Sequence, residues 1–329
     1  MTGAPDLGPL AVPARRSLNG DHTGEVGTML PPFVDHHVHL MLVGVDALAG
    51  SPIAAVVDLG SPLAVLAETR AERVPRVDGA GQFLTAVGGY PTNRPWAPAS
   101  SIREIPAEAS GRRAHLSAPA EVAVSELHAF GASVVKVALN ADAGPVFDRS
   151  TLDAIVHAAH ARGLPVVAHV EGEGMTRLAS EAGVDALAHV PFTERVDDDL
   201  IAESVASGRR WISTLFVQGH GTPSADHDRA LDNLARFHAA GGRVLYGTDL
   251  GNGDQPLGVN AGELAALQAA GLGASELLDA LADPWPRADR VPGVATFVPG
   301  PPPEEDADLP AWLARAVLLA AEDLEPFDA

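Results

Sequence analysis

Two histidines stand one residue apart in the apolar segment FVDHHVHL, residues 33–40. Because side chains alternate between the two faces of a strand, His37 and His39 would point to the same side. Two imidazoles at this spacing can bind one metal ion. The pair alone is equally compatible with a histidine cluster on a surface strand. His36 would face the other way and be packed or solvated.

A lysine, Lys136, lies in the middle of another apolar run, VVKVAL, residues 134–139. Burying an ammonium group there costs free energy, so one interpretation is a lysine that snorkels from a strand end. The other is a desolvated, neutral amine that reacts with carbon dioxide. The resulting carbamate would be an anionic oxygen ligand able to bridge two metal ions.

Three further candidate ligands, His169, His189 and Asp249, each end an apolar run. Taken singly, such histidines are more often core residues, and an aspartate there is often a helix N-cap or turn residue. At the carboxyl ends of barrel strands, the same residues would gather where barrel enzymes hold their sites. Asp249 could then bind a metal ion and accept a proton from water.

The elements that must position these residues alternate along the chain from about Pro31. Runs rich in Val, Leu and Ile predict eight buried strands, at residues 33–40, 53–59, 83–87, 134–139, 165–170, 186–190, 211–216 and 244–248. Alanine-rich segments of helical period predict helices at residues 120–130, 151–162, 176–182, 198–206, 225–239 and 263–270. Glycines that act as C-caps are expected after several of them, at Gly131, Gly163, Gly183, Gly241 and Gly271. Residues 41–51 leave room for barely two helical turns.

Eight such units predict an α/β fold, a (β/α)8 TIM barrel, over residues 31–285. A doubly wound open sheet is the alternative, although no glycine-rich phosphate loop follows the first strand. Residues 1–30 look loop-like, as an N-terminal extension or the remnant of a small sandwich domain. Residues 286–329 form a C-terminal extension, with a strand expected near 294–302 and a strand or helix at 311–321.

The order of an HxH pair, a lysine, two histidines and an aspartate on strands one, four, five, six and eight resembles the amidohydrolase superfamily. The resemblance is to its binuclear subtype with a carboxylated bridging lysine, the imidazolonepropionase- and prolidase-like amidohydrolases. The segments PPFVDHHVHL, VVDLG and TAVGGYPT look like the first three strands of this family. The resemblance covers roughly residues 31–281. Only about thirty residues precede the HxH strand, so the family's small β-sandwich domain would be truncated or absent.

The resemblance implies a role for each member of the set. The HxH pair would bind the more buried of two divalent metal ions, expected to be zinc, and His169 and His189 would bind the other. Lys136, as a carbamate, and a hydroxide would bridge them. Asp249 would bind the buried metal, orient the hydroxide and protonate the leaving group, so Asp249 and Lys136 are the expected catalytic residues.

Hydrolysis of an amide bond is the leading expectation, in a small molecule such as a peptide, an N-acyl amino acid or a cyclic amide. A lactone or phosphotriester hydrolase would use the same centre. A mononuclear deaminase of this superfamily would place a glutamate three residues after His169, whereas Glu171 and Glu173 lie two and four residues after it. A non-catalytic metal-binding barrel predicts the loss of a ligand, and all six candidates are present.

Loops after the strands are expected to contact the substrate. Tyr90, Arg94 and Trp96 follow the third strand, His220 the seventh and Asn252 the eighth. An arginine beside a tryptophan could clamp a substrate carboxylate, or it could be an ordinary exposed arginine. The remaining histidines that we assign to helix surfaces are His115, His128, His157, His160, His227 and His238.

The composition excludes several classes of function. With 43 acidic and 22 basic residues, the formal charge of −21 would repel nucleic acid and anionic membranes. The absence of cysteine excludes disulfides, thiolate metal sites and cysteine nucleophiles. No apolar run of about 18 residues and no signal-peptide core are present, so a cytoplasmic location is expected. The expected partner is a small-molecule substrate, and an alanine-rich barrel is compatible with a homo-oligomer.

Overall fold

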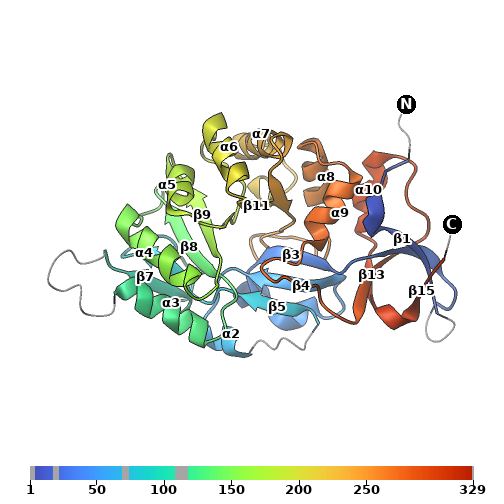
Figure 1. Cartoon of the computed structure of the whole chain (residues 1–329), viewed down its shortest axis with the longest axis horizontal. Helices are drawn as coiled ribbons and strands as arrows, with labels where there is room; N and C mark the ends of the chain where they lie inside the picture. Colours follow the sequence, from blue (N-terminus) through green and yellow to red (C-terminus); the bar gives the residue numbers. More distant parts are fainter. Residues whose placement is uncertain (1–3, 18–21, 69–73, 108–117, 328–329) are drawn as a thin grey trace.

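A computed structural model describes residues 4–17, 22–68, 74–107 and 118–327. Two regions can be followed in Figure 1: parallel strands with helices around them, and an antiparallel sheet beside which both chain ends lie. His115 lies outside the described residues. Within the described part, no helix has the length and apolar character needed to cross a membrane.

The parallel strands form an α/β fold with two sheets. The larger sheet has the order β12-β11-β10-β9-β8-β6-β7. Its strands are β6 (Phe83–Ala86), β7 (Ile102–Ile105), β8 (Val135–Asn140), β9 (Val166–Glu171), β10 (Ala186–Leu187), β11 (Arg210–Ile212) and β12 (Arg243–Leu245). The smaller sheet joins β3 (Phe33–Val38), β4 (Ile53–Asp58) and β5 (Arg76–Gly79). All eight predicted strands are therefore present, whereas β5 and β7 were not expected.

The smaller parallel sheet is connected to the larger one at both of its edge strands, β5 and β3. Only residues 80–82 separate β5 from β6, so the chain passes directly from one sheet to the other. On the opposite side, β3 bonds to the segment after β12. The amide of His39 donates to the carbonyl of Leu250 at 2.8 Å, and the amide of Asp249 donates to the carbonyl of His37 at 2.8 Å. These bonds bring Asp249 beside the HxH pair.

The six predicted helices are confirmed within two residues at each end. They are α3 (Pro119–Ala129), α4 (Arg149–His160), α5 (Met175–Ala182), α6 (Asp198–Ala206), α7 (Ala225–Ala239) and α8 (Ala261–Ala269). The five glycines expected as C-caps all have positive φ, between 69° and 101°. Residues 41–51 hold only two short pieces, α1 (Leu40–Val43) and the 3₁₀ turn η2 (Val45–Leu48). The remaining helices are α2 (Leu63–Glu68), α9 (Ala274–Ala282) and α10 (Leu309–Leu313).

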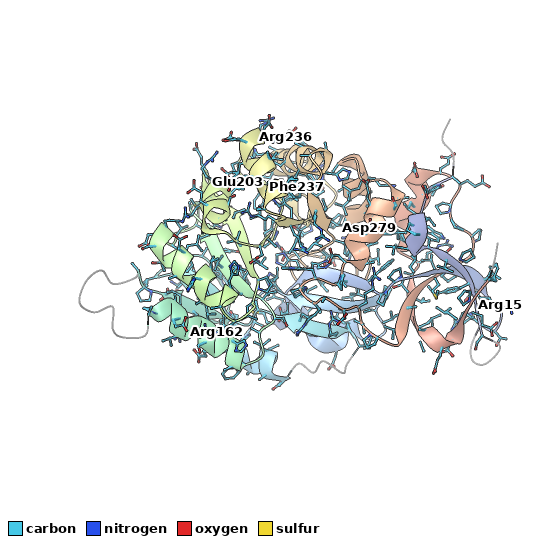
Figure 2. All side chains as sticks on the ribbon, in the orientation of Figure 1. Arg15, Arg162, Glu203, Arg236, Phe237 and Asp279 are labelled. Atoms are coloured by element: carbon cyan, nitrogen blue, oxygen red, sulfur yellow. The ribbon has the colours of Figure 1, made fainter. Side chains whose placement is uncertain are left out.

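Apolar residues on both faces explain why the parallel strands are buried. Every residue of β3, β4 and β8 is buried, as expected for strands covered on both sides. Helices supply the outer layer. Phe237 of α7, labelled in Figure 2, stacks on Trp211 of β11 with ring centroids 4.0 Å apart. Such aromatic contacts fix the helices against the strands that carry the candidate ligands.

The chain ends form a five-stranded antiparallel sheet in the order β14-β13-β2-β1-β15. Its strands are β1 (Val12–Arg16), β2 (Val26–Leu30), β13 (Val294–Pro299), β14 (Val317–Ala320) and β15 (Leu324–Pro326). The expectation that residues 1–30 are loop-like was therefore wrong for β1 and β2. The segment 311–321 holds the end of α10 and then β14, so it is both helix and strand. Arg15, at the far end of the molecule in Figure 2, pairs with Glu325 at 3.0 Å.

Candidate metal centre

His37, His39 and Asp249 form a compact buried cluster, in which one ligand atom of each lies within 4.8 Å of the others. Asp249 Oδ1 is 3.3 Å from Nε2 of His37 and 3.2 Å from Nε2 of His39. Strand alternation thus places both histidines on one side, as the HxH spacing predicts. Asp249 lies four residues after the end of β12 and has φ 55°, so its backbone is in the left-handed region where its side chain joins the cluster.

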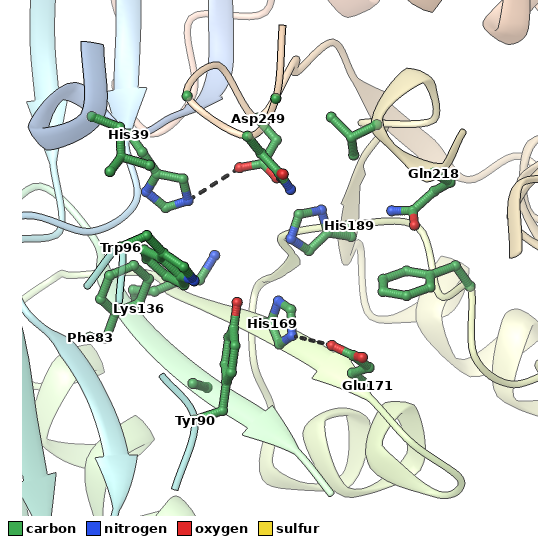
Figure 3. A pocket seen from close by; sticks show the side chains of 17 residues that line it. His39, Phe83, Tyr90, Trp96, Lys136, His169, Glu171, His189, Gln218 and Asp249 are labelled. Carbon is green, nitrogen blue, oxygen red and sulfur yellow. Dashed lines mark hydrogen bonds and ion pairs between the residues drawn. The ribbon is translucent and has the colours of Figure 1, made fainter. Parts of the chain in front are cut away.

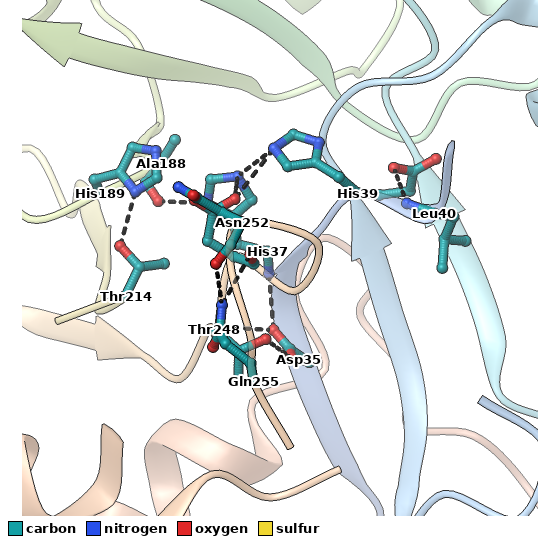
Figure 4. A network of polar contacts seen from close by, with 12 residues as sticks. Asp35, His37, His39, Leu40, Ala188, His189, Thr214, Thr248, Asn252 and Gln255 are labelled. Carbon is teal, nitrogen blue, oxygen red and sulfur yellow. Dashed lines mark hydrogen bonds and ion pairs between the residues drawn. The ribbon is translucent and has the colours of Figure 1, made fainter. Parts of the chain in front are cut away.

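The outer nitrogens of two histidines are held by hydrogen bonds. His37 Nδ1 is 2.8 Å from the carbonyl oxygen of Ala188, and His189 Nδ1 is 2.8 Å from Oγ1 of Thr214 (Figure 4). Because a carbonyl can only accept, His37 carries its proton on Nδ1, and Nε2 keeps a lone pair for a metal ion. His36 is buried on the other side, with its ring nitrogens 2.8 and 3.0 Å from two backbone carbonyls. It is packed rather than solvated, the first of the two alternatives expected for it.

Asp35 links the HxH strand to the segment that carries Asp249. Its carboxylate accepts from the amide of His37 at 3.1 Å and from the amide and hydroxyl of Thr248 at 3.0 and 2.5 Å (Figure 4). Burial raises the pKa of Asp35 to about 7, against the hydrogen bonds that lower it. The residue does not line the cavity, and the sequence analysis did not single it out.

Lys136 is buried, with 1% of its surface exposed, on β8. Burial lowers the pKa of its amine to about 7, although the charges of Asp249 and Asp58 oppose this shift. The lysine is therefore desolvated rather than snorkelling. The composition holds a further signal, because Lys136 is the only lysine among 329 residues.

His169 and His189 lie on the other side of the cavity. Their ring centroids are 5.1 Å apart, and the centroid of His189 is 4.7 Å from that of His37. His169 Nε2 is 3.1 Å from Oε2 of Glu171, which leaves Nδ1 as its other ligand atom (Figure 3). Within the described residues, His37, His39 and Asp249 are the only set of three or more His, Asp or Glu side chains whose ligand atoms all lie within 4.8 Å of one another.

The ionisation states suit metal binding. Burial lowers the pKa of His37, His169 and His189, so these imidazoles are neutral near pH 7. Burial by itself would raise the pKa of Asp249, but the neighbouring His37 and His39 bring it well below the ordinary value. Neutral imidazole and ionised carboxylate are the forms that bind metal ions.

A cavity of about 440 Å³ opens over the centre. It is lined by His39, Lys136, His169, His189 and Asp249, while His37 lies behind them. Of the expected substrate contacts, Tyr90, Trp96 and Asn252 line this cavity. The Tyr90 ring stacks on His169 with centroids 5.1 Å apart, and its hydroxyl points toward the ligand residues (Figure 3).

The other two expected contacts lie outside the cavity lining. Arg94 is exposed, with its guanidinium carbon 5.6 Å from the ring centroid of Tyr90. His220 is exposed and packs edge-to-face on Phe216, with centroids 5.9 Å apart. Lining residues that were not among the expected substrate contacts include Leu42, Phe83, Glu171, Phe192, Val217 and Gln218.

The helix histidines stay away from the centre. His128, His157 and His160 are exposed on α3 and α4, as predicted. His227 and His238 are partly exposed on α7. Their surface positions give no reason to assign a second metal site to them.

Sequence comparisons find only partial relatives of the chain. No family model matches the chain. Uncharacterized proteins of Mycobacterium tuberculosis and Mycobacterium bovis are 32% identical over 154 residues, which is 42% of this chain and 40% of each relative. The match thus spans less than half the length of these curated relatives.

Solved structures match most of the chain at low identity. A Xaa-Pro dipeptidase with bound methionine in the active site superposes with a TM-score of 0.68 at 19% identity, over 91% of this chain and 87% of its own. An amidohydrolase gives 0.66 at 18%, over 95% and 91%, and phenylurea hydrolase B gives 0.63 at 17%, over 90% and 85%. The chain therefore shares the fold of amidohydrolase-type enzymes.

Proposed function

We propose that this chain is a metal-dependent amidohydrolase that cleaves the amide C–N bond of a small molecule, such as a peptide, an N-acyl amino acid or a cyclic amide. The observation that carries the proposal is the convergence of His37, His39 and Asp249 beside a cavity lined by the buried amine of Lys136. The hydrolases among the solved structures of similar fold support this class of reaction.

We infer that the two parallel sheets close into one (β/α)8 barrel. The direct passage from β5 to β6 and the hydrogen bonds between β3 and residues 246–250 support closure at both edges of the smaller sheet. β5 and β6 would together form one bent strand of the barrel, since β5 pairs with β4 and β6 with β8, and β7 would be an additional strand on β6. Barrels of this kind hold their sites at the carboxyl ends of the strands, where the candidate histidines and Asp249 lie, with Lys136 further inside on β8.

The donor set fits divalent metal ions. Asp249 Oδ1 is buried without a hydrogen bond and faces Nε2 of both histidines of the HxH pair. These three residues would hold one ion, His169 and His189 a second, and a carbamate on Lys136 would bridge them. Imidazole and carboxylate donors suit zinc, which we expect in both positions. Bound there, the ions would activate a water molecule and polarise the scissile carbonyl.

Lys136 and Asp249 have complementary tasks. The neutral amine of Lys136 adds to the carbon of carbon dioxide, forming an N–C bond and releasing one proton. The carboxylate of Asp249 accepts a proton from the attacking water and delivers it to the leaving nitrogen. The water oxygen bonds to the carbonyl carbon as the C–N bond breaks, so the products are one carboxylic acid and one amine.

The single lysine makes the proposal directly testable. Protein reconstituted with zinc and ¹³C-bicarbonate should give one carbamate carbon resonance, and Lys136→Ala should lose it. The wild type should bind two zinc ions and hydrolyse members of a panel of dipeptides, N-acyl amino acids and cyclic amides. Lys136→Ala should lose activity by more than about 100-fold, because it removes a metal ligand. His157→Ala, an exposed histidine on α4, is the matched control.

Two results would count against the proposal in different ways. A protein that binds no metal, with Lys136→Ala as active as the wild type, would contradict the metal centre. A preference for lactones or phosphotriesters over every amide would replace the assigned reaction and leave the metal centre standing.

A further inference from the structure

One wall of the cavity is apolar. Side chains of Leu42, Phe83, Tyr90, Trp96, Phe192 and Val217 line it above the candidate metal ligands. The Trp96 ring contacts three other rings around the cavity, with its centroid 6.0 Å from those of Tyr90 and Phe83 and 6.3 Å from that of His39. Contact with such a wall would stabilise a bound aromatic or branched apolar group, because both surfaces are removed from water.

Outside the candidate metal centre, the charge that lines the cavity is negative. Among the described residues that line it, the charged side chains other than histidines are Lys136, Glu171 and Asp249. Lys136 and Asp249 belong to the candidate metal centre. Glu171 faces the cavity with 26% of its side chain exposed and is held by His169 and Asn140. A substrate carboxylate beside Glu171 would meet a like charge, and among the described lining residues outside the candidate metal centre no cationic side chain could pair with it.

Uncharged polar groups are available instead. The amide side chain of Gln218 points into the cavity in Figure 3, from the 3₁₀ turn η4 (Phe216–Gln218). Asn252 lines the cavity as well and donates to Oδ2 of Asp249 at 2.9 Å. Amide side chains can pair with a neutral carbonyl or N–H group without needing a charge on the substrate.

We propose that the site selects an uncharged substrate, an amide with an aromatic or branched apolar substituent, over peptides and N-acyl amino acids that carry a free carboxylate. This inference rests on the proposed function and narrows its substrate class. Arg94 does not serve as a carboxylate clamp in this arrangement, because its guanidinium is exposed beside the Tyr90 ring and outside the cavity lining. Glu171 is the residue that sets the charge preference.

Matched substrate pairs isolate the carboxylate. N-acetyl-2-phenylethylamine and N-acetylphenylalanine differ only by that group. In a second pair, 4-methylacetanilide and 4-acetamidobenzoate, a methyl group is replaced by a carboxylate, so the two compounds differ in charge but little in size. The zinc-reconstituted enzyme should favour the neutral member of each pair in kcat/KM by about tenfold or more. In the second pair the anion has the better leaving amine, so intrinsic reactivity cannot produce this preference. Calorimetric titration of metal-free protein with the first pair should show tighter binding of the neutral compound.

Glu171→Gln tests the assigned residue. In this variant the ratio of kcat/KM for the carboxylate member to kcat/KM for the neutral member should rise several-fold over the wild type. The ratio is informative even if both absolute rates change. Glu173→Gln, an exposed acid on the same loop, should leave the ratio as in the wild type.

Each failure is distinguishable. Equal or better use of the carboxylate substrates would overturn the inference and leave the proposed function standing. An unchanged ratio in Glu171→Gln would overturn the role of Glu171. Hydrolysis of neither pair, nor of any amide in the broader panel, would contradict the proposed function and this inference together.

Discussion

Asp35 organises the candidate centre without touching the cavity. One carboxylate accepts hydrogen bonds from the backbone of His37 and from both the backbone and the hydroxyl of Thr248. These bonds fix the position of Thr248, and therefore of the next residue, Asp249, relative to the HxH strand. A metal site requires such fixed relative positions, because ligands that are free to move bind more weakly.

Replacing Asp35 by alanine should therefore weaken metal binding and lower stability. Two buried backbone amides and a hydroxyl would lose their acceptor, at about 1–3 kcal/mol for each unsatisfied group. The affinity for zinc should fall by about 10- to 100-fold. Competition with a chelator and denaturant unfolding measure the two effects. Thr248→Val, which removes only the hydroxyl, should have a smaller effect, and equal zinc affinity in Asp35→Ala and the wild type would contradict the role.

The ligand candidates could be predicted from the sequence because the rules that place them are local. Strand alternation puts His37 and His39 on one side, and a strand end puts Asp249 beside them. The role of Asp35 could not be predicted in this way. Its partner Thr248 is 213 positions away, and an aspartate in an apolar run does not indicate which donor it will meet.

At the scale of elements, helix α8 holds the turn that carries Gln218. Glu263 of α8 is buried and accepts from the amides of Leu215 and Phe216 at 3.0 and 2.7 Å. Burial raises the pKa of Glu263 from 4.5 to about 7, although its hydrogen bonds oppose the shift. Burial likewise raises the pKa of Asp35 to about 7.

The raised pKa of Glu263 predicts how stability changes with pH. Between about pH 4.5 and 7 the folded protein holds a proton on Glu263 that the unfolded chain has lost. The contribution of this group to the free energy of unfolding is therefore present at low pH and lost as pH rises to about 7. It amounts to about 3 kcal/mol at most. Urea unfolding measured from pH 5 to 8 should show a smaller decrease in the free energy of unfolding for Glu263→Gln than for the wild type. The same decrease with pH in both proteins would contradict the prediction.

The contact between Gly60 and Phe83 positions one wall of the cavity. A Cβ atom on Gly60, just after β4, would lie 2.0 Å from the Phe83 ring of β6. Gly60→Ala should push this ring away and destabilise the fold by about 1–3 kcal/mol. Thermal unfolding and KM for a neutral aryl amide measure the result. Gly273→Ala, where the nearest atom is the end of a glutamate side chain at 3.4 Å, is the control. Equal effects in both variants would show that the ring contact is unimportant.

Elements with a strong period of their own were predictable, and those that depend on distant pairing were not. Helix α7 begins and ends where its 3.6-residue pattern predicts. β1, with the sequence VPARR, has no clear alternation and lies between β2 and β15. Its pairing of Ala14 with Pro326 joins residues more than 300 positions apart. Short-range patterns contain no information about such a partner.

At the scale of the whole molecule, the terminal antiparallel sheet is attached to the strand that carries the HxH pair. β2 ends at Leu30 and β3 begins at Phe33, whose amide donates to Oγ1 of the buried Thr296 in β13 at 3.3 Å. The antiparallel sheet therefore holds the start of β3 through the chain connection to β2 and through this hydrogen bond to β13. Destabilising the sheet should therefore weaken metal binding at the candidate centre.

Deleting residues 317–329 should test this coupling. The deletion removes β14 and β15, exposes the edges of β13 and β1, and takes Val317, Leu319 and Leu324 from the small core around Phe297. Each lost apolar side chain costs about 1.5–3 kcal/mol if it was fully buried. Thermal unfolding should shift to lower temperature, and the zinc content after reconstitution should fall below that of the full chain. Arg15→Ala, which breaks only the exposed pair with Glu325, should change stability by less than about 1 kcal/mol. A truncated protein with normal zinc content would mean that β3 is held by the parallel sheets alone.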